Sequence, residues 1–223
     1  MYELKAVIFD MDGVIFDTES LWKKAFECAT KEFALDLTES YRQSTCGKKE
    51  SLIREELTNA YPKLDVAGYR NFMLDYVNRT IDCGDFEIKI GFLELIEFLK
   101  SKNLKIALAT SSHKKRAEAL FKKKNLDLYS IFDTTVFAED VGTKSKPDPY
   151  IFLSTADRLG EKPENCIVLE DSLNGVEAAI NGGFQTVMVV DLIEPTAYCE
   201  ERCQNIVRSL SEFCSLIKRD ERD

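Results

Sequence analysis

Five short apolar runs, separated by segments with helical periodicity, place the strongest limit on the fold of this chain. The runs are residues 4–9, 104–109, 134–138, 166–169 and 186–190. Between the later runs, apolar residues recur every three or four positions, which is the spacing of a helix with one buried face. Strands that alternate with helices form a parallel sheet covered by helices on both faces. The sequence therefore predicts an α/β fold with a doubly wound, Rossmann-like parallel sheet.

A long helical segment interrupts this alternation between the first and the second run. It has little strand character, and aromatic residues such as Trp22 and Phe26 recur in it at helical spacing. This pattern predicts a small helical bundle that is inserted into the sheet domain. The expected domains are a core made of residues 1–16 and 87–223 and a helical insert made of residues 17–86.

Charge and cysteine content limit the partners and the compartment. The formal net charge of −9 argues against nucleic acid or an anionic membrane surface as the main partner. Seven cysteines without a C-x-x-C pair fit free thiols in a reducing compartment. No stretch approaches the roughly 20 apolar residues of a membrane span. We therefore expect a cytoplasmic monomer, and the single histidine, His113, disfavours a histidine-based catalytic or metal site.

Polar side chains of complementary kinds follow four of the apolar runs. They are Asp10 and Asp12 after the first, Thr110 and Ser111 after the second, Lys146 in the loop after the third, and Glu170 with Asp171 at the end of the fourth. The carboxyl ends of parallel strands meet at one edge of a sheet, where ligands bind. Carboxylates bind Mg²⁺ together with phosphate oxygens, and lysine offsets phosphate charge. This set of side chains predicts a site for Mg²⁺ and a small phosphorylated metabolite.

Each of these features has a simpler interpretation when it is taken singly. Asp10 and Asp12 are compatible with a solvated turn, where carboxylates are common. Ser112 is expected to cap the helix that follows it, and Glu170 with its neighbours is compatible with another helix cap. Lys146 is compatible with an ordinary loop. The agreement of four positions at one edge of the predicted sheet favours the functional interpretation.

Four ordered motifs, which span nearly the whole chain, resemble those of the haloacid dehalogenase superfamily. They are Asp10-Met-Asp12-Gly13 with Asp17-Thr18, Ala109-Thr110-Ser111-Ser112, Lys146-Pro147-Asp148-Pro149 and Glu170-Asp171-Ser172-Leu-Asn-Gly175. The paired aspartates of the first motif resemble the form found in the phosphatases and phosphomutases of the superfamily. The helical insert resembles the cap domain that many members carry between the first two motifs.

The resemblance implies a chemical role for each matched residue. Asp10 would be the nucleophile that forms an aspartyl phosphate, and Asp12 would be the general acid and base. Thr110, Ser111 and Lys146 would hold the phosphoryl group during its transfer. These roles agree with the physical requirements of phosphoryl transfer, in which positioning and cationic stabilisation dominate the rate.

The resemblance also implies the metal site and the reaction. Asp171, with Glu170 beside it, would complete a Mg²⁺ site together with the Asp10 carboxylate and the backbone carbonyl of Asp12. The implied activity is hydrolysis of a small phosphomonoester, such as a sugar phosphate or a nucleoside monophosphate, by a Mg²⁺-dependent phosphatase.

Residues of the insert are candidates for substrate selection. The segment Cys46-Gly47-Lys48-Lys49-Glu50 resembles the substrate-specificity loop of capped phosphatases in this superfamily. Lys48 and Lys49 would then contact the leaving group, although a glycine turn with exposed lysines fits the pattern equally well. Glu19 is a candidate for hydrogen bonding to a substrate hydroxyl, or for capping the first helix of the insert.

Two other functions remain open. β-Phosphoglucomutases share almost the same core motifs, but they carry a histidine twelve residues after the nucleophile, where this sequence has Trp22. The resemblance implies that this histidine protects the phosphoenzyme, so its absence favours water as the acceptor. A signalling domain that stores phosphate on Asp10 also uses clustered acids and a lysine, but such domains are much shorter and lack a large insert.

Replacement of Lys48 tests the substrate loop. The variant Lys48→Ala is expected to change the order of preference among phosphomonoesters more than it changes hydrolysis of a small generic ester, because the lysine would contact the leaving group. The measurement is kcat/KM for each member of a substrate panel. Equal losses on every substrate would instead place Lys48 in the chemistry or in the fold.

Overall fold

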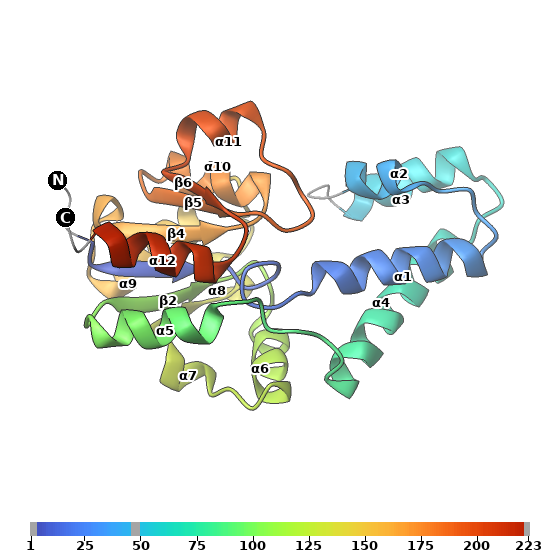
Figure 1. Cartoon of the computed structure of the whole chain (residues 1–223). Helices are drawn as coiled ribbons and strands as arrows, with labels where there is room; N and C mark the ends of the chain where they lie inside the picture. Colours follow the sequence, from blue (N-terminus) through green and yellow to red (C-terminus); the bar gives the residue numbers. More distant parts are fainter. Residues whose placement is uncertain (1–3, 46–49, 221–223) are drawn as a thin grey trace. The chain divides into compact units, whose positions relative to one another are not determined.

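The computed structural model describes residues 4–45 and 50–220 of the chain (Figure 1). The chain divides into two compact units. The core unit consists of Met1–Asp17 and Glu87–Asp223, and the helical unit consists of Thr18–Phe86. The sequence places the two boundaries after residues 16 and 86. Among the described residues, no helix combines the length and the hydrophobicity that a membrane span requires.

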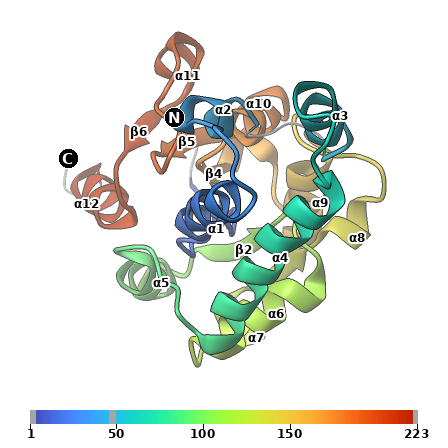
Figure 2. The same cartoon turned by 90° about the vertical axis from the view of Figure 1, so that its right-hand side faces the viewer.

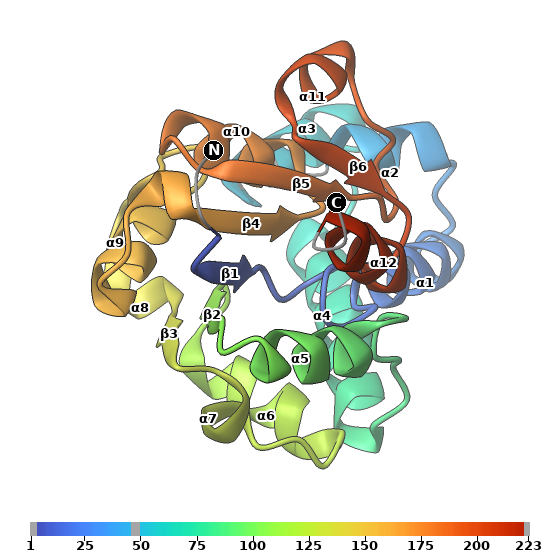
Figure 3. The same ribbon diagram turned by 60° about the vertical axis from the view of Figure 1, so that its left-hand side comes forward.

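The core unit is built on a sheet of parallel strands (Figure 3). The strands are β1 (Ala6–Phe9), β2 (Lys105–Ala109), β3 (Thr134–Val136), β4 (Cys166–Glu170), β5 (Gln185–Val189) and β6 (Asn205–Val207). Their order across the sheet is β3-β2-β1-β4-β5-β6. The chain therefore starts in the middle of the sheet, runs outward to one edge, and returns past β1 to build the other half. This order confirms the predicted doubly wound fold.

Helices cover both faces of this sheet (Figure 2). Those of the core unit are α5 (Phe92–Ser101), α6 (Lys114–Lys123), α7 (Leu128–Ile131), α8 (Ala138–Val141), α9 (Tyr150–Leu159), α10 (Leu173–Asn181), α11 (Ala197–Arg202) and α12 (Leu210–Asp220), with a short 3-10 helix η1 (Pro163–Asn165). On one face, α9 packs against β1, β2 and β3, and α10 packs against β4 and β5. On the other face, α5 packs against β2 and α12.

The central strand β1 is apolar at every position because both of its faces are covered. Successive side chains of a strand point to opposite faces. Ile8 belongs to the cluster that includes Phe152 of α9. Phe9 points to the other face, where its ring meets those of Phe92 and Phe132 edge to face at centroid distances of 5.9 and 6.2 Å. A strand buried on both faces is a rigid support for the residues that follow it.

The helical unit contains four helices within the described residues. They are α1 (Glu19–Glu32), α2 (Glu39–Thr45), α3 (Glu50–Ala60) and α4 (Val66–Cys83). Helices α1 and α4 pack against each other. Their contact uses residues at helical spacing, with Phe26 buried on α1 and Tyr69 and Met73 buried on α4. The Asp65 side chain caps α4 by accepting a hydrogen bond from the Gly68 N–H at 2.9 Å.

The two ends of the core unit that adjoin the helical unit pair with each other. The Asp17 N–H donates to the Glu87 carbonyl at 2.9 Å, and the Lys89 N–H donates to the Ile15 carbonyl at 2.8 Å. The Lys89 ammonium lies 2.7 Å from Asp191 Oδ1, just beyond the end of β5. The exit and the re-entry of the chain are therefore tied to each other and to the sheet.

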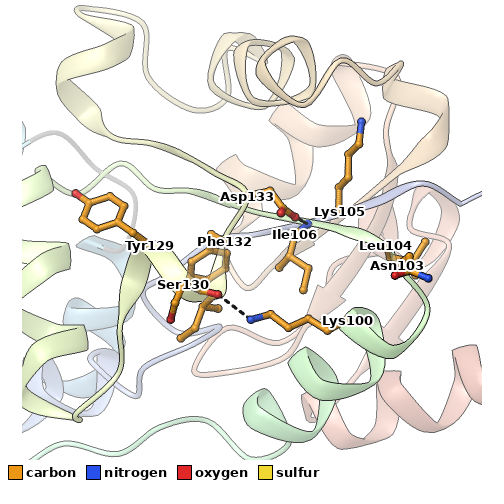
Figure 4. A pocket seen from close by; sticks show the side chains of 10 residues that line it. Lys100, Asn103, Leu104, Lys105, Ile106, Tyr129, Ser130, Phe132 and Asp133 are labelled. Atoms are coloured by element: carbon orange, nitrogen blue, oxygen red, sulfur yellow. Dashed lines mark hydrogen bonds between the residues drawn. The ribbon is translucent and has the colours of Figure 1, made fainter.

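A hollow of about 490 Å³ opens at the amino ends of β2 and β3 (Figure 4). On one side of it the Lys100 ammonium donates to the Ser130 carbonyl at 2.8 Å, and on the other the Asp133 carboxylate accepts a hydrogen bond from the Ile106 N–H at 2.7 Å. Ligands of parallel sheets bind at the carboxyl ends of the strands. The hollow therefore lies at the opposite end of the sheet from the predicted site.

Candidate active site

The carboxyl ends of β1, β2 and β4 bring the predicted residues of the core unit together, and we call this part of the sheet the carboxyl edge. Phe9 of β1 lies opposite Leu169 of β4. The Asp10 N–H then donates to the Leu169 carbonyl at 3.0 Å, so Asp10 lies beside the end of β4. Because β1 is flanked by β2 on one side and β4 on the other, this is the topological switch point of the sheet.

Lys146 binds two buried carboxylates at the carboxyl edge. Its Nζ lies 2.5 Å from Asp10 Oδ1 and 2.5 Å from Glu170 Oε1. The three side chains are each at most 9% exposed. Taking a charged group out of water costs several kcal/mol unless a partner compensates it. The lysine and the two carboxylates therefore depend on one another.

Burial shapes the acidity of this group of side chains. Burial raises the pKa of the Asp10 carboxyl above its ordinary value, and the charge of Glu170 adds to that effect while Lys146 opposes it. Burial alone would lower the pKa of Lys146, but the charges of Asp10 and Glu170 outweigh it and raise that pKa. The lysine therefore keeps its charge at neutral pH, and it is available to offset the charge of a bound anion.

Two glycines make room for the carboxylates of Glu170, the last residue of β4, and Asp171, which follows it. A Cβ at Gly13, where φ is +80°, would overlap Asp171 Oδ2. A Cβ at Gly175 on α10 would overlap Glu170 Oε1. Glycine is the residue that tolerates both the positive φ and the close approach. The two glycines therefore allow the carboxylates of Glu170 and Asp171 to lie directly against backbone.

Glu170 is held from two sides. Its Oε1 accepts from Lys146, and its Oε2 accepts from the Ser172 N–H at 2.8 Å and the Ser172 hydroxyl at 2.9 Å. Ser172 also caps α10, because its Oγ accepts a hydrogen bond from the Gly175 N–H at 3.1 Å. The helix-cap interpretation of this motif and a role in the site are therefore compatible.

The second strand contributes Thr110, which is buried. Its N–H donates to the Val136 carbonyl at 3.0 Å, and its Oγ1 accepts a hydrogen bond from the Ser112 N–H at 3.0 Å. The hydroxyl proton of Thr110 is then available to a ligand oxygen. The neighbouring Ser111 is exposed.

Two donors that are not among the predicted site residues orient Asp12. The Ser112 hydroxyl donates to Asp12 Oδ2 at 2.8 Å, and Arg116 Nη1 donates to the same oxygen at 2.7 Å. The Ser112 side chain thus turns toward Asp12. The expectation that Ser112 caps the following helix is wrong, because the N-cap residue of α6 is His113. The Glu139 carboxylate binds the start of α6 instead, by accepting a hydrogen bond from the Lys114 N–H at 3.2 Å.

One sequence signal points to Arg116. The first turn of α6 carries Lys114, Lys115 and Arg116 and no acidic residue. Basic residues are unfavourable at the positive end of the helix dipole. Their presence there indicates acidic partners from elsewhere in the chain, and Asp12 and Glu139 are such partners.

The remaining predicted residues belong elsewhere. Glu19 is the first residue of α1 and is part of the helical unit. Lys48 and Lys49 lie outside the described residues. The roles suggested for these three residues stay predictions.

The side chains at the carboxyl edge fit a divalent cation. The carboxylates of Asp10, Glu170 and Asp171 are buried there. Within residues 4–45 and 50–220, no group of three His, Cys, Asp or Glu side chains is placed to hold a metal ion by itself. Mg²⁺ does not require such a group, since it is commonly bound through one or two carboxylates together with water and substrate phosphate. Asp10 and Asp171 are two buried carboxylates of the kind that such a site uses.

Comparison with known proteins places the chain among hydrolases. Residues 4–183 match a family described as haloacid dehalogenase-like hydrolase. The chain is 36% identical over 187 residues to a phosphorylated carbohydrates phosphatase of Thermotoga maritima, a match that covers 82% of this chain and 84% of that protein. It is 32% identical over 200 residues to a β-phosphoglucomutase of Bacillus subtilis, with 83% of each chain covered.

A solved structure supports the fold. The crystal structure of a haloacid dehalogenase-like protein of unknown function from Agrobacterium tumefaciens matches with a TM-score of 0.82 at 19% identity. The match covers 98% of this chain and 99% of that one. At this level of identity the likeness shows the fold alone.

A pair of glycine substitutions tests the close approach of Asp171 to Gly13. Gly13→Ala and Gly183→Ala both place alanine at a positive φ, +80° and +79°, which costs about 1 kcal/mol of stability. A Cβ at Gly183 meets nothing within 4 Å, whereas a Cβ at Gly13 displaces the Asp171 carboxylate. Thermal denaturation is expected to shift in both variants, and hydrolysis of p-nitrophenyl phosphate to fall only in Gly13→Ala. Equal activity of the two variants would contradict a role for this contact.

Loss of the buried lysine tests the interdependence of the three charged groups. Lys146→Met is expected to lower the free energy of unfolding at neutral pH by about 3–5 kcal/mol, because Asp10 and Glu170 remain buried without their cation. The measurement is chemical denaturation. The control is Lys144→Met. Lys144 is exposed, and its ammonium lies 3.6 Å from the centroid of the Tyr150 ring. A cation–π contact at an exposed site contributes about 1 kcal/mol or less to stability. Similar small changes in both variants would contradict the prediction.

Proposed function

Because the chain belongs to the haloacid dehalogenase-like hydrolase family, we propose that it is a Mg²⁺-dependent phosphatase that hydrolyses a small phosphomonoester. The substrate class is a sugar phosphate or a nucleoside monophosphate. The observation that carries the proposal is the contact of Lys146 with Asp10 at the switch point of the sheet, where both side chains are buried. A buried carboxylate with a cation beside it is suited to nucleophilic attack on a phosphate group.

In this proposal Asp10 is the nucleophile. A carboxylate oxygen of Asp10 attacks the phosphorus atom, the bond from phosphorus to the ester oxygen breaks, and an aspartyl phosphate forms. Charge spreads over the three phosphoryl oxygens in the transition state. Lys146 neutralises part of that charge, and Glu170 holds the lysine in place through its contact at 2.5 Å. When bound through Asp10, Asp171 and the Asp12 carbonyl, Mg²⁺ would supply further positive charge to the same oxygens.

Asp12 moves the protons. It first gives a proton to the departing alkoxide, and it then takes a proton from the water that attacks the aspartyl phosphate. The second step breaks the bond between phosphorus and the Asp10 oxygen and releases inorganic phosphate. Thr110 and Ser111 hold phosphoryl oxygens during both steps, Thr110 through its hydroxyl proton.

The helical unit is the cap domain in this proposal. It is inserted between β1 and β2, so it joins the core directly after the residues that carry the chemistry. Glu19, Lys48 and Lys49 would select the substrate by contacting its leaving group. A cap also limits the access of water during the first transfer.

A mutase is the second candidate, because a β-phosphoglucomutase is among the relatives at 32% identity. Trp22, on α1, stands where the resemblance to the mutases implies a histidine. The replacement favours water over a sugar hydroxyl as the acceptor of the phosphoryl group. Conversion of β-glucose 1-phosphate to glucose 6-phosphate at a rate above phosphate release would favour the mutase.

Phosphate release from a panel of sugar phosphates and nucleoside monophosphates tests the proposed reaction. We expect release that depends on Mg²⁺ and that EDTA abolishes, because the carboxylates at the carboxyl edge need a cation to accept a phosphate. Absence of release from every member of the panel, with and without Mg²⁺, would contradict a phosphatase.

Substitution of the nucleophile tests the mechanism. Asp10→Asn is expected to lower kcat by at least about 1,000-fold, because an amide is not a nucleophile. Thermal stability is expected to change little, because the amide has nearly the same volume and Lys146 keeps Glu170 as its partner. The matched control is Asp157→Asn, on the exposed side of α9, which is expected to keep the wild-type rate. Undiminished hydrolysis by Asp10→Asn would exclude the aspartyl-phosphate route.

A further inference from the structure

We propose that Arg116 is a positioning residue that, together with Ser112, aims the carboxylate of Asp12 at the reacting oxygen. The inference rests on the proposed function, in which Asp12 is the general acid and base. Arg116 lies outside the four motifs and does not enter the mechanism described above.

The three side chains form a closed set of hydrogen bonds. Arg116 Nη1 donates to Asp12 Oδ2 at 2.7 Å and to Ser112 Oγ at 2.6 Å, and Ser112 Oγ donates to Asp12 Oδ2 at 2.8 Å. Two donors therefore converge on one carboxylate oxygen. This convergence fixes the plane of the carboxylate more tightly than a single contact does, because rotation would break both hydrogen bonds.

Asp12 needs such support because of its place in the chain. It follows the end of β1 by three positions, and its backbone is held by one isolated bridge to Phe16 and not by the ladder of the sheet. Its side chain is 25% exposed, whereas that of Asp10 is 9% exposed. Proton transfer requires a hydrogen bond of correct length and direction to the leaving oxygen. A displacement of about 1 Å costs on the order of 100-fold in rate.

Arg116 itself is held rigidly. It lies in the first turn of α6, whose start is bound by the Glu139 carboxylate through the Lys114 N–H. The next residue, Ala117, is fully buried, so the helix is fixed against the core. The guanidinium is planar and presents its donors in a fixed geometry.

Helix stability does not explain the arginine. A cation in the first turn opposes the helix dipole, and the Arg116 side chain is only 30% exposed. Its guanidinium donates hydrogen bonds to Asp12 and Ser112, both of which lie outside α6. An arginine at this position is therefore better explained by its hydrogen bond to Asp12 than by a contribution to the stability of α6.

The experiment compares Arg116→Met with Lys115→Met, which removes a positive charge from the adjacent exposed position. The substrate is a sugar phosphate that the wild-type enzyme hydrolyses. In Arg116→Met, kcat is expected to fall about 10- to 100-fold, and KM is expected to stay within about twofold of the wild-type value. Lys115→Met is expected to keep wild-type values. Arg116→Lys is expected to recover part of the rate, because it restores a cationic donor.

Rapid mixing with p-nitrophenyl phosphate provides a readout that a purely structural role would not move. The p-nitrophenolate group leaves without an acid, but hydrolysis of the aspartyl phosphate still needs Asp12 as a base. Arg116→Met is therefore expected to release one equivalent of p-nitrophenolate in a burst and then to turn over slowly. Ser112→Ala is expected to show the same burst and slow turnover. If Arg116→Met does not fold, the kinetics of Ser112→Ala test the positioning role instead.

The outcomes separate the two proposals. Kinetics of Arg116→Met equal to those of Lys115→Met, or a rise in KM at unchanged kcat, would overturn the positioning role and leave the phosphatase intact. Absence of phosphate release by the wild-type protein on the whole panel would overturn the proposed function and the inference with it.

Discussion

The arrangement of the site depends on one buried ammonium group. Lys146 comes from the loop between α8 and α9, yet it binds Asp10 after β1 and Glu170 at the end of β4. Two carboxylates side by side in a buried place repel each other and lose their hydration, and the lysine compensates both effects. The ion pairs therefore tie together three segments that are distant in the sequence. They do so at the topological switch point, where the strand order reverses beside β1.

Close approach of carboxylates to backbone is the second constraint. Gly13 and Gly175 leave the space that Asp171 and Glu170 occupy; Gly13 lies in the turn after β1, and Gly175 lies in the first turn of α10. Glycine in a helix such as α10 costs roughly 0.5–1 kcal/mol relative to alanine. The sequence accepts this cost at the carboxyl edge because a Cβ at Gly175 would displace Glu170, which in turn positions Lys146.

The sequence is sufficient where short-range patterns decide the structure. The strands β1 and β4 are apolar at nearly every position, and the parallel order then brings Asp10 beside Glu170 without further information. The strand β6 was not predicted, because its apolar residues Ile206 and Val207 stand between Asn205 and Arg208, whereas β3 belongs to the longer run 134–138. The contact of Arg116 with Asp12 joins residues 104 positions apart. Such a pairing depends on how α6 packs, which no local pattern contains.

The two aspartates of the first motif have different surroundings, and the proposed reaction depends on this difference. Asp10 is buried against Lys146, whereas Asp12 is partly exposed and is held by Arg116 and Ser112. Neighbouring carboxylates take separate roles when their environments separate their properties. The separation begins where β1 ends, because the Asp10 N–H still donates to the Leu169 carbonyl of β4, whereas Asp12 directly precedes the turn at Gly13. In the proposed reaction, a nucleophile fixed at the end of β1 and a proton carrier fixed from α6 would therefore arise from residues only two positions apart.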